Sequence, residues 1–344
     1  MKSKVYFTKE ITPASLIRIY EALGRKLRGS IGVKISTGEM GGNNYLHPEL
    51  IGDLVDKLDG TIVECCTAYG GSRQEKDKHW ETIKAHGFFP RFKVDLMDEF
   101  GEIEIPVHNG FHLDKDIVGE HLENYDSLLI LSHFKGHAMG GFGGALKNIS
   151  IGIGSTNGKA YIHSAGKTTD STDCWGKYIA GQDEFLESMA DAVEAVNRFV
   201  GYKNMAYISV ANRLSVDCDC DSHPAEPKMA DIGIFASLDP VALDQACYDA
   251  VRKDVVMQEV HQLQTDNDHH GGGSGHGIHT GTCRHTDGGC HPQAGGRRQS
   301  AHGVLLEDDA AGTDKANAAD HLSCNARHIV ARGLVQYDVA EAVS

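Results

Sequence analysis

The segment from Ser127 to Asn148 constrains the fold of this chain more than any other. It opens with Ser-Leu-Leu-Ile-Leu-Ser, the most apolar strand candidate in the sequence, which leads directly into the glycine-rich run HFKGHAMGGFGGALKN. Loops at the carboxyl ends of strands are where open α/β sheets place their ligands. The segment therefore predicts a ligand site directly after a buried strand.

Alternating strand and helix patterns in the first 260 residues predict the fold class. Short β-branched runs alternate with amphipathic helical stretches, as expected of an α/β fold with a mostly parallel sheet flanked by helices. A length of 344 residues allows one large domain or two lobes. The predicted strands are Val5–Thr8, Ile31–Ser36, Thr61–Cys65, Ser127–Ser132, Met205–Val210 and Asp231–Ala236, and the predicted helices are 13–27, His47–Leu58, Arg73–His86, Gln182–Val200 and 241–251.

The character of the sequence changes after about Val260. Ten of the twenty histidines lie between His261 and His328, among glycine runs, and no period of 2 or 3.6 persists there. We therefore expect an α/β domain over residues 1–260 and an irregular His/Gly-rich tail over residues 261–344 that is disordered or only loosely packed.

Charge and hydropathy exclude several classes of partner. A formal net charge of -15 disfavours nucleic acid and anionic membranes. There is no apolar run of about 18 residues, and the segment after Met1 lacks the apolar stretch of a secretory signal. We expect a cytoplasmic protein with no nucleic-acid or membrane partner. Its nine cysteines are then thiols, metal ligands or core residues, not a disulfide framework.

The glycine-rich run carries the first set of candidate site residues. His133 and His137 could chelate a metal, transfer protons or contact a substrate, and Lys135 and Lys147 add positive charge. We expect these four to be catalytic. Glycines let backbone N–H groups approach an anion, and the expected anion-binding residues are Gly141, Gly143, Gly144 and Asn148. The alternative is a tight turn between strand and helix, with both histidines hydrogen-bonded in a polar pocket.

The second set lies in the run Asp-Cys-Asp-Cys-Asp-Ser-His at residues 217–223. In extended form its two thiols point one way and its carboxylates the other. Cys218, Cys220, His223 and Asp217 could provide half of a site for zinc, iron or an iron-sulfur cluster, which needs further ligands from elsewhere. Cys65, Cys66 and Cys174 are the cysteines that could supply them. A redox-active thiol pair, a site for a hard cation and a structural acidic turn remain alternatives. Glu64 and Tyr69, at a strand end, could line the same cleft.

Several of these motifs together resemble a known family. SHFKGHAMGGFGGALKNISIG, ECCTAYGG, QDEFLESMADAV and LSVDCDCDSHPAEPKMADIGIFASLDPVALDQACYD are similar to the domain-of-unknown-function family 362, often labelled iron-sulfur-centre proteins, over roughly residues 1–252. The resemblance implies an α/β domain and cluster binding. Members with the iron-sulfur label often carry ferredoxin cysteine motifs, which this chain lacks, so a metal role would transfer to Cys218, Cys220, His133 and His137. The glycine-rich loop also resembles, distantly, the His/Gly/Lys loop of the lactate racemase group.

The tail departs from that family. His-Gly-Ile-His-Thr at 276–280 resembles the family's closing segment, and codons for the next four residues can be read one base along as Glu-His-Ala-Ala. A frameshift near Thr280 is therefore a hypothesis, which sequencing of independent DNA would test.

Three classes of function follow from these residues. The leading hypothesis is a metal- or iron-sulfur-binding redox protein that acts on a small anionic substrate or passes electrons to a partner. The second is a metal-independent isomerase or lyase that uses His133 and His137 for proton transfer on a small carboxylate or phosphate. The third is a metal-storage or electron-transfer protein without a reaction of its own.

Overall fold

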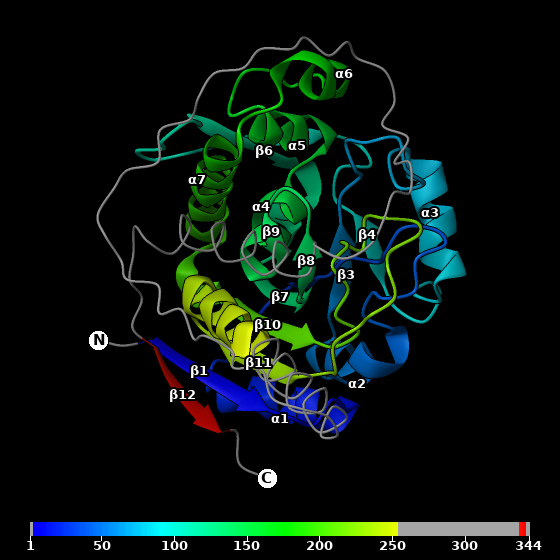
Figure 1. Ribbon diagram of the computed structural model, residues 1–344, viewed down its shortest axis with the longest axis vertical. Helices are drawn as coiled ribbons and strands as arrows, with labels where there is room; N and C mark the ends of the chain where they lie inside the picture. The colour runs from blue at the N-terminus through cyan, green and yellow to red at the C-terminus, as the bar shows by residue number, and fades with distance from the viewer. Residues whose placement is uncertain (1–2, 254–336, 342–344) are drawn as a thin grey trace, which may run out of the picture.

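The structure is a computed structural model that describes residues 3–253 and 337–341 of the chain. It confirms an α/β fold in which a mostly parallel sheet is flanked by helices (Figure 1). Residues 261–336 and 342–344 of the predicted tail, with the proposed frameshift position, lie outside the described residues.

The central sheet has eight strands. Their spatial order is β12 (Tyr337–Glu341), β1 (Ser3–Thr8), β11 (Gly233–Ser237), β10 (Met205–Ala211), β7 (Ser127–His133), β2 (Ile31–Lys34), β3 (Thr61–Glu64) and β4 (Val94–Leu96). β11 is antiparallel to both of its neighbours, and all the other neighbouring strands are parallel. Two small antiparallel sheets pair β5 (Glu102–Pro106) with β6 (Lys115–Gly119) and β8 (Lys135–His137) with β9 (Gly141–Gly143).

Helices cover both faces of the sheet. They are α1 (Pro13–Ala22), α2 (Pro48–Leu58), α3 (Lys76–Ala85), α4 (Ala145–Ile153), α5 (Thr156–His163), α6 (Ser171–Asp173), α7 (Gln182–Val200) and a helix at 240–253, with shorter turns at Glu120–Asn124, Cys174–Tyr178 and Tyr202–Asn204. In Figure 1, α5, α6 and β6 lie at the end of the molecule remote from β1 and β12. No helix among the described residues has the length and apolarity that crossing a membrane would require.

The two faces of β7 show why the sheet needs both layers. Leu128 and Ile130 pack into a core formed with α4, α7 and the helix at 240–253. Leu129 and Leu131 point the other way and pack with α1, α2 and α3. Successive strand side chains alternate between faces, so a strand that is apolar at every position must be covered on both sides.

The register of the parallel strands brings four strand ends together. Val210 of β10 pairs with His133 of β7, and Lys34 of β2 pairs with Ile130 of β7. β3 in turn pairs with β2. Because parallel strands end at the same edge, the segments after β3, β2, β7 and β10 gather there, and they contain most of the predicted site residues.

Candidate functional site

The segment with the two candidate thiols forms a turn, so its side chains do not simply alternate as they would in extended form. The backbone N–H of Asp221 donates to the carbonyl oxygen of Cys218 over 3.0 Å. The N–H of Glu39 donates to the carbonyl of Asp219 over 2.8 Å, which ties this turn to the loop after β2. Cys218 and Cys220 line one cavity, whereas the Asp219 carboxylate is buried away from it. The turn therefore directs both thiols toward the same cavity.

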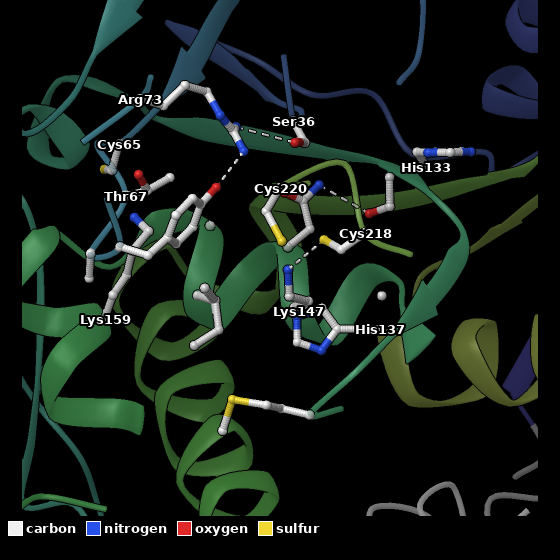
Figure 2. Close-up of a pocket in the computed structure, with 18 of the residues that line it drawn as sticks. Ser36, Cys65, Thr67, Arg73, His133, His137, Lys147, Lys159, Cys218 and Cys220 are labelled. Carbon is white, nitrogen blue, oxygen red and sulfur yellow. Dashed lines mark hydrogen bonds between the residues drawn. The ribbon is translucent and has the colours of Figure 1, made fainter. Parts of the chain in front are cut away.

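His137 lies beside these two thiols. It is the last residue of β8, in the hairpin that follows β7. One ligand atom from each of His137, Cys218 and Cys220 lies within 4.8 Å of the other two, so this group could hold a metal ion. Figure 2 shows the three side chains on one side of the cavity. Three protein ligands leave one position of a tetrahedral ion open, which is typical of catalytic and not structural zinc.

Lys147 sets the charge of the thiol pair. It projects from α4, and its Nζ donates to Cys218 Sγ over 3.3 Å (Figure 2). The hydrogen bond with Cys220 and the nearby Lys147 hold the pKa of Cys218 well below its usual range. The same hydrogen bond, with burial, raises the pKa of Cys220. The pair is thus a Cys218 thiolate that accepts from a Cys220 thiol.

The imidazole of His137 is neutral at pH 7. Burial, reinforced by the positive charge of Lys147, lowers the pKa of His137 to about 3. The backbone N–H of Gly140 donates to its Nδ1 over 2.9 Å. Because Nδ1 accepts, the neutral ring carries its proton on Nε2.

His133 has a different environment from His137. Its Nδ1 lies 2.8 Å from Asp219 Oδ1, and its Nε2 lies 2.7 Å from the carbonyl oxygen of Asn212. Lys135 completes the arrangement, since its Nζ lies 2.8 Å from Asp219 Oδ2. Both ring nitrogens of His133 are therefore occupied, and the ring does not join the group of possible metal ligands. His133 and Lys135 thus both contact the carboxylate of Asp219 in the thiol turn.

The backbone N–H groups that were expected to bind an anion beside these glycines already bind the side chain of Asp244. The carboxylate of Asp244 accepts from the backbone N–H groups of Ala145 and Leu146 over 2.7 and 2.8 Å, at the first turn of α4. A Cβ at Gly144 would lie 2.4 Å from Asp244 Oδ1, and a Cβ at Gly143 would lie 3.2 Å from Lys135 Cε. Gly141 has a φ of 74°, which suits the β8–β9 hairpin. These glycines make room for side chains and a tight turn, and a substrate anion could reach the helix N-terminus only by displacing Asp244.

The other predicted metal ligands lie outside the group. His223 is exposed, and Asp217 accepts from the N–H of Ala225 over 2.8 Å. None of Cys65, Cys66 and Cys174 belongs to the group of possible ligands. Cys65 instead donates from Sγ to the carbonyl of Ile153 over 3.2 Å.

The cavity behind the thiol turn is rich in cations. It has a volume of ≈ 290 Å³. The basic side chains that line it are Lys34, Lys135, Lys147, Lys159 and Arg73, and Glu64 is the single carboxylate lining it among the described residues. Asn148 lines it too, but its amide binds the carbonyl of Lys34 over 3.1 Å. In a chain of net charge -15, a cavity with this excess of cations suits an anionic ligand.

Arg73 holds the wall of the cavity together. Its guanidinium donates to Glu39 Oε2 over 3.3 Å, to Glu64 Oε2 over 3.4 Å and to the hydroxyl of Tyr69 over 3.2 Å. Glu39, Glu64 and Arg73 are all buried. The structure thus places Glu64 and Tyr69 in one wall, on a buried ion-pair network that the sequence did not reveal.

A second, more open pocket of ≈ 640 Å³ lies on the other side of the thiol turn. It shares Tyr69, His137, Cys218 and Cys220 with the inner cavity and adds Asp217 and Asp221. The candidate metal ligands therefore lie between an inner cationic chamber and an outer, more acidic one.

One known protein family and several solved structures are similar to parts of this chain. Residues 31–249 match the family described as "Domain of unknown function (DUF362)". No functionally curated protein matches the sequence. Similar solved structures include the lactate racemase apoprotein from Thermoanaerobacterium thermosaccharolyticum, with 12% identity over 60% of this chain and 50% of that one and a TM-score of 0.38. A protein from Thermotoga maritima has 14% identity over 71% of this chain and 59% of that one, with a TM-score of 0.41. This chain thus spans half to three fifths of those two chains.

Proposed function

The chain belongs to the domain-of-unknown-function family 362, and from that premise we propose that it is an enzyme that binds one soft transition-metal ion, zinc or iron, and acts on a small anionic substrate. His137, Cys218 and Cys220 would hold the ion. Its substrate would occupy the inner cationic cavity.

The observation that carries the proposal is the convergence of one imidazole and two thiols from separate loops. Two thiolates that bind the same ion at about 2.3 Å each can lie at most about 4.6 Å apart. The three candidate ligand atoms lie within 4.8 Å of one another, so small side-chain rotations would bring them into that range. An iron-sulfur cluster usually takes four cysteine ligands, and the described residues bring only Cys218 and Cys220 to this place. A single ion therefore fits better than a cluster.

The ionisation of the thiol pair suits such an ion. The low pKa of Cys218 supplies one thiolate without a metal, and a cation would draw the proton from Cys220 as well. A bound zinc or iron ion would supply Lewis-acid chemistry toward an oxygen of the substrate. Lys147 would stabilise negative charge beside it, and His133, Lys135 and Asp219 would keep the turn in place.

One hydrogen bond must change for this ion to bind. Nδ1 of His137 already accepts from Gly140, so ligation would use Nε2, and the ring proton would move to Nδ1. The N–H of Gly140 would then have to turn away, because two donors cannot face each other. The flexible backbone of Gly140 allows this.

The same hydrogen bond favours a second candidate function. It suits a metal-free site in which the Cys218 thiolate and the neutral His137 move protons on a small anion, as in an isomerase or lyase. Here Lys147 would keep Cys218 ionised, and the ion would be absent.

Metal analysis of the anaerobically purified chain separates the two candidates. We expect about one equivalent of zinc or iron per chain, and a cobalt-substituted form whose charge-transfer absorption reports thiolate ligands. Cys218→Ser, Cys220→Ser and His137→Gln should each lose most of the metal, whereas Cys174→Ser, which alters a buried cysteine outside the group, should keep it. A folded wild-type protein that takes up no metal would refute the first candidate and support the second.

A further inference from the structure

Two buried lysines line the end of the inner cavity away from the thiols. Lys34 projects from the carboxyl end of β2, and Lys159 projects from α5. Both line the inner cavity and both are buried. Among the described residues, neither Nζ has a carboxylate oxygen within 4.0 Å, the distance at which the other buried cations of the site, Lys135 and Arg73, form their ion pairs.

The partners of these two lysines are neutral. Lys34 Nζ donates to the carbonyl of Ile35 and to Asn148 Oδ1, the latter over 3.1 Å. Lys159 Nζ donates to the carbonyl of Gly154. A buried ammonium that has only dipoles for partners is costly unless an anion balances it. Burial lowers the pKa of Lys34 to about 8, and the negative charge of Glu64 offsets only part of that effect.

A third polar group at the same end lacks any partner. Thr67 lines the cavity and is 5% exposed, and its Oγ1 makes no hydrogen bond. Thr156, on the same helix as Lys159, donates to the carbonyl of Thr67 over 3.3 Å, so the two segments are in contact. Figure 2 shows Thr67 and Lys159 on one side of the cavity, with Cys218, Lys147 and His137 on the other. Buried hydroxyls normally have partners, so this one points to a ligand.

The backbone is also shaped around Lys34. A Cβ at residue 152 would lie 2.8 Å from both Cε and Nζ of Lys34. The ammonium group therefore packs closely against the backbone of α4, and the absence of a side chain at Gly152 leaves space for it.

We propose that Lys34, Lys159 and Thr67 form an oxoanion subsite, which binds a carboxylate or phosphate group at the end of the cavity opposite the thiols. The subsite itself needs no metal. Its consequence for the substrate rests on the proposed function: the molecule carries its oxoanion at one end and the reacting oxygen at the other. A volume of ≈ 290 Å³ limits it to a small molecule.

Anion binding to metal-free protein tests the subsite by itself. Inorganic phosphate and malonate are titrated calorimetrically at constant ionic strength, with chloride as the balancing salt. We expect saturable binding of at least one of them, and the one that binds identifies the group. Lys34→Met and Lys159→Met should each weaken that binding by about tenfold or more. Lys57→Met, which alters an exposed lysine of α2, should leave it unchanged.

Two further readouts separate binding from folding. Without anion, Lys34→Met and Lys159→Met should still melt cooperatively as folded proteins, because neither substitution breaks an ion pair within 4.0 Å among the described residues. Thr67→Val should weaken anion binding, whereas Thr37→Val, which removes another buried hydroxyl without a partner that does not line the cavity, should not. Failure of both anions to bind wild-type protein, or unchanged binding in both lysine variants, would overturn the subsite. If the protein binds phosphate or malonate but takes up no metal, the proposed metal centre is refuted and the proposed subsite is supported.

Discussion

His133 and Asp219 are joined by a hydrogen bond of 2.8 Å between Nδ1 and Oδ1, which links the end of β7 to the turn that carries both candidate thiol ligands. Lys135 pairs with the other oxygen of the same carboxylate over 2.8 Å. One buried acid thus fixes the distance between two loops that are far apart in sequence.

Replacement of Asp219 by Asn should therefore affect both stability and the site. It leaves Lys135 as an uncompensated buried cation, and breaking a buried ion pair costs about 3–5 kcal/mol. We expect the free energy of unfolding in urea to fall by about that amount and metal affinity to fall with it. Asp221→Asn, in the same turn but exposed, serves as the control and should change neither. Wild-type metal affinity in Asp219→Asn would show that the thiol turn needs no such anchor.

Replacement of Gly144 by Ala should destabilise the first turn of α4. The φ of Gly144 is -142°, so alanine meets no backbone strain, and the effect is the contact with Asp244 alone. Overpacking of this kind costs about 1–3 kcal/mol. Gly176→Ala, whose Cβ meets no atom within 4 Å, should be close to neutral in the same thermal melts. Equal melting temperatures for the two variants would contradict the proposed crowding.

Asp116 should make stability fall as pH rises. It is fully buried, and burial raises its pKa from 3.8 to about 7. Between those values the unfolded chain releases a proton that the folded chain retains, so rising pH favours unfolding. This contribution is lost progressively from about pH 4 to about pH 7, at up to about 1.4 kcal/mol per unit.

Urea unfolding at pH 5 and pH 8 measures that contribution. Asp116→Asn cannot titrate, so its stability difference between the two pH values should be smaller than that of the wild type. Asp53→Asn, at an exposed position of α2, should keep the wild-type difference. The same difference in all three proteins would rule out a raised pKa for Asp116.

Arg73 should contribute most to the free energy of unfolding at neutral and alkaline pH. Its charge keeps the pKa of the buried Glu39 below the ordinary range, and Lys34 and Arg73 together do the same for the pKa of the buried Glu64. Such a contribution to stability is present above the unfolded-state pKa of about 4.5 and is lost as pH falls below it. Arg73→Met should therefore lose about 3–5 kcal/mol at pH 7 and less in acid.

An exposed ion pair provides the comparison for Arg73. Arg91 pairs with Asp56 on the surface, where both side chains are about half exposed. Arg91→Met should change the free energy of unfolding far less than Arg73→Met does. Equal losses for the two variants would mean that the buried network around Arg73 adds nothing beyond a surface pair.

The elements with strong periodicity could be predicted from the sequence. α7 has the predicted bounds, and β7 ends one residue later than predicted. α1 ends at Ala22 and not at the predicted Leu27, because Gly24 takes a φ of 64°. The hairpin of β8 and β9 could not be predicted, since each strand has three residues and half of these are glycine. The direction of β11 depends on how its connection crosses the sheet, which local patterns do not encode.

The candidate site could be predicted only in part. The ends of β7 and β10 are neighbours because the two strands pair in parallel, and this brings His137 to the thiols. The sequence could not separate His137 from His133, because their roles depend on which partners the fold supplies. Lys34 lies in a strand whose other residues are typical of a buried core, and Lys159 lies on a helix that the sequence patterns did not predict. The sequence therefore did not indicate that either lysine lines a cavity.

The division of the candidate ligands between two segments would have a consequence for how the protein matures. His137 leaves the ribosome well before Cys218, and the two come into contact only when β10 docks beside β7. A nascent chain could offer an ion the imidazole but not yet the thiols. Uptake of a tightly held ion would then mark the completion of the sheet, and a chain stalled before that point would release its ion to any competing chelator.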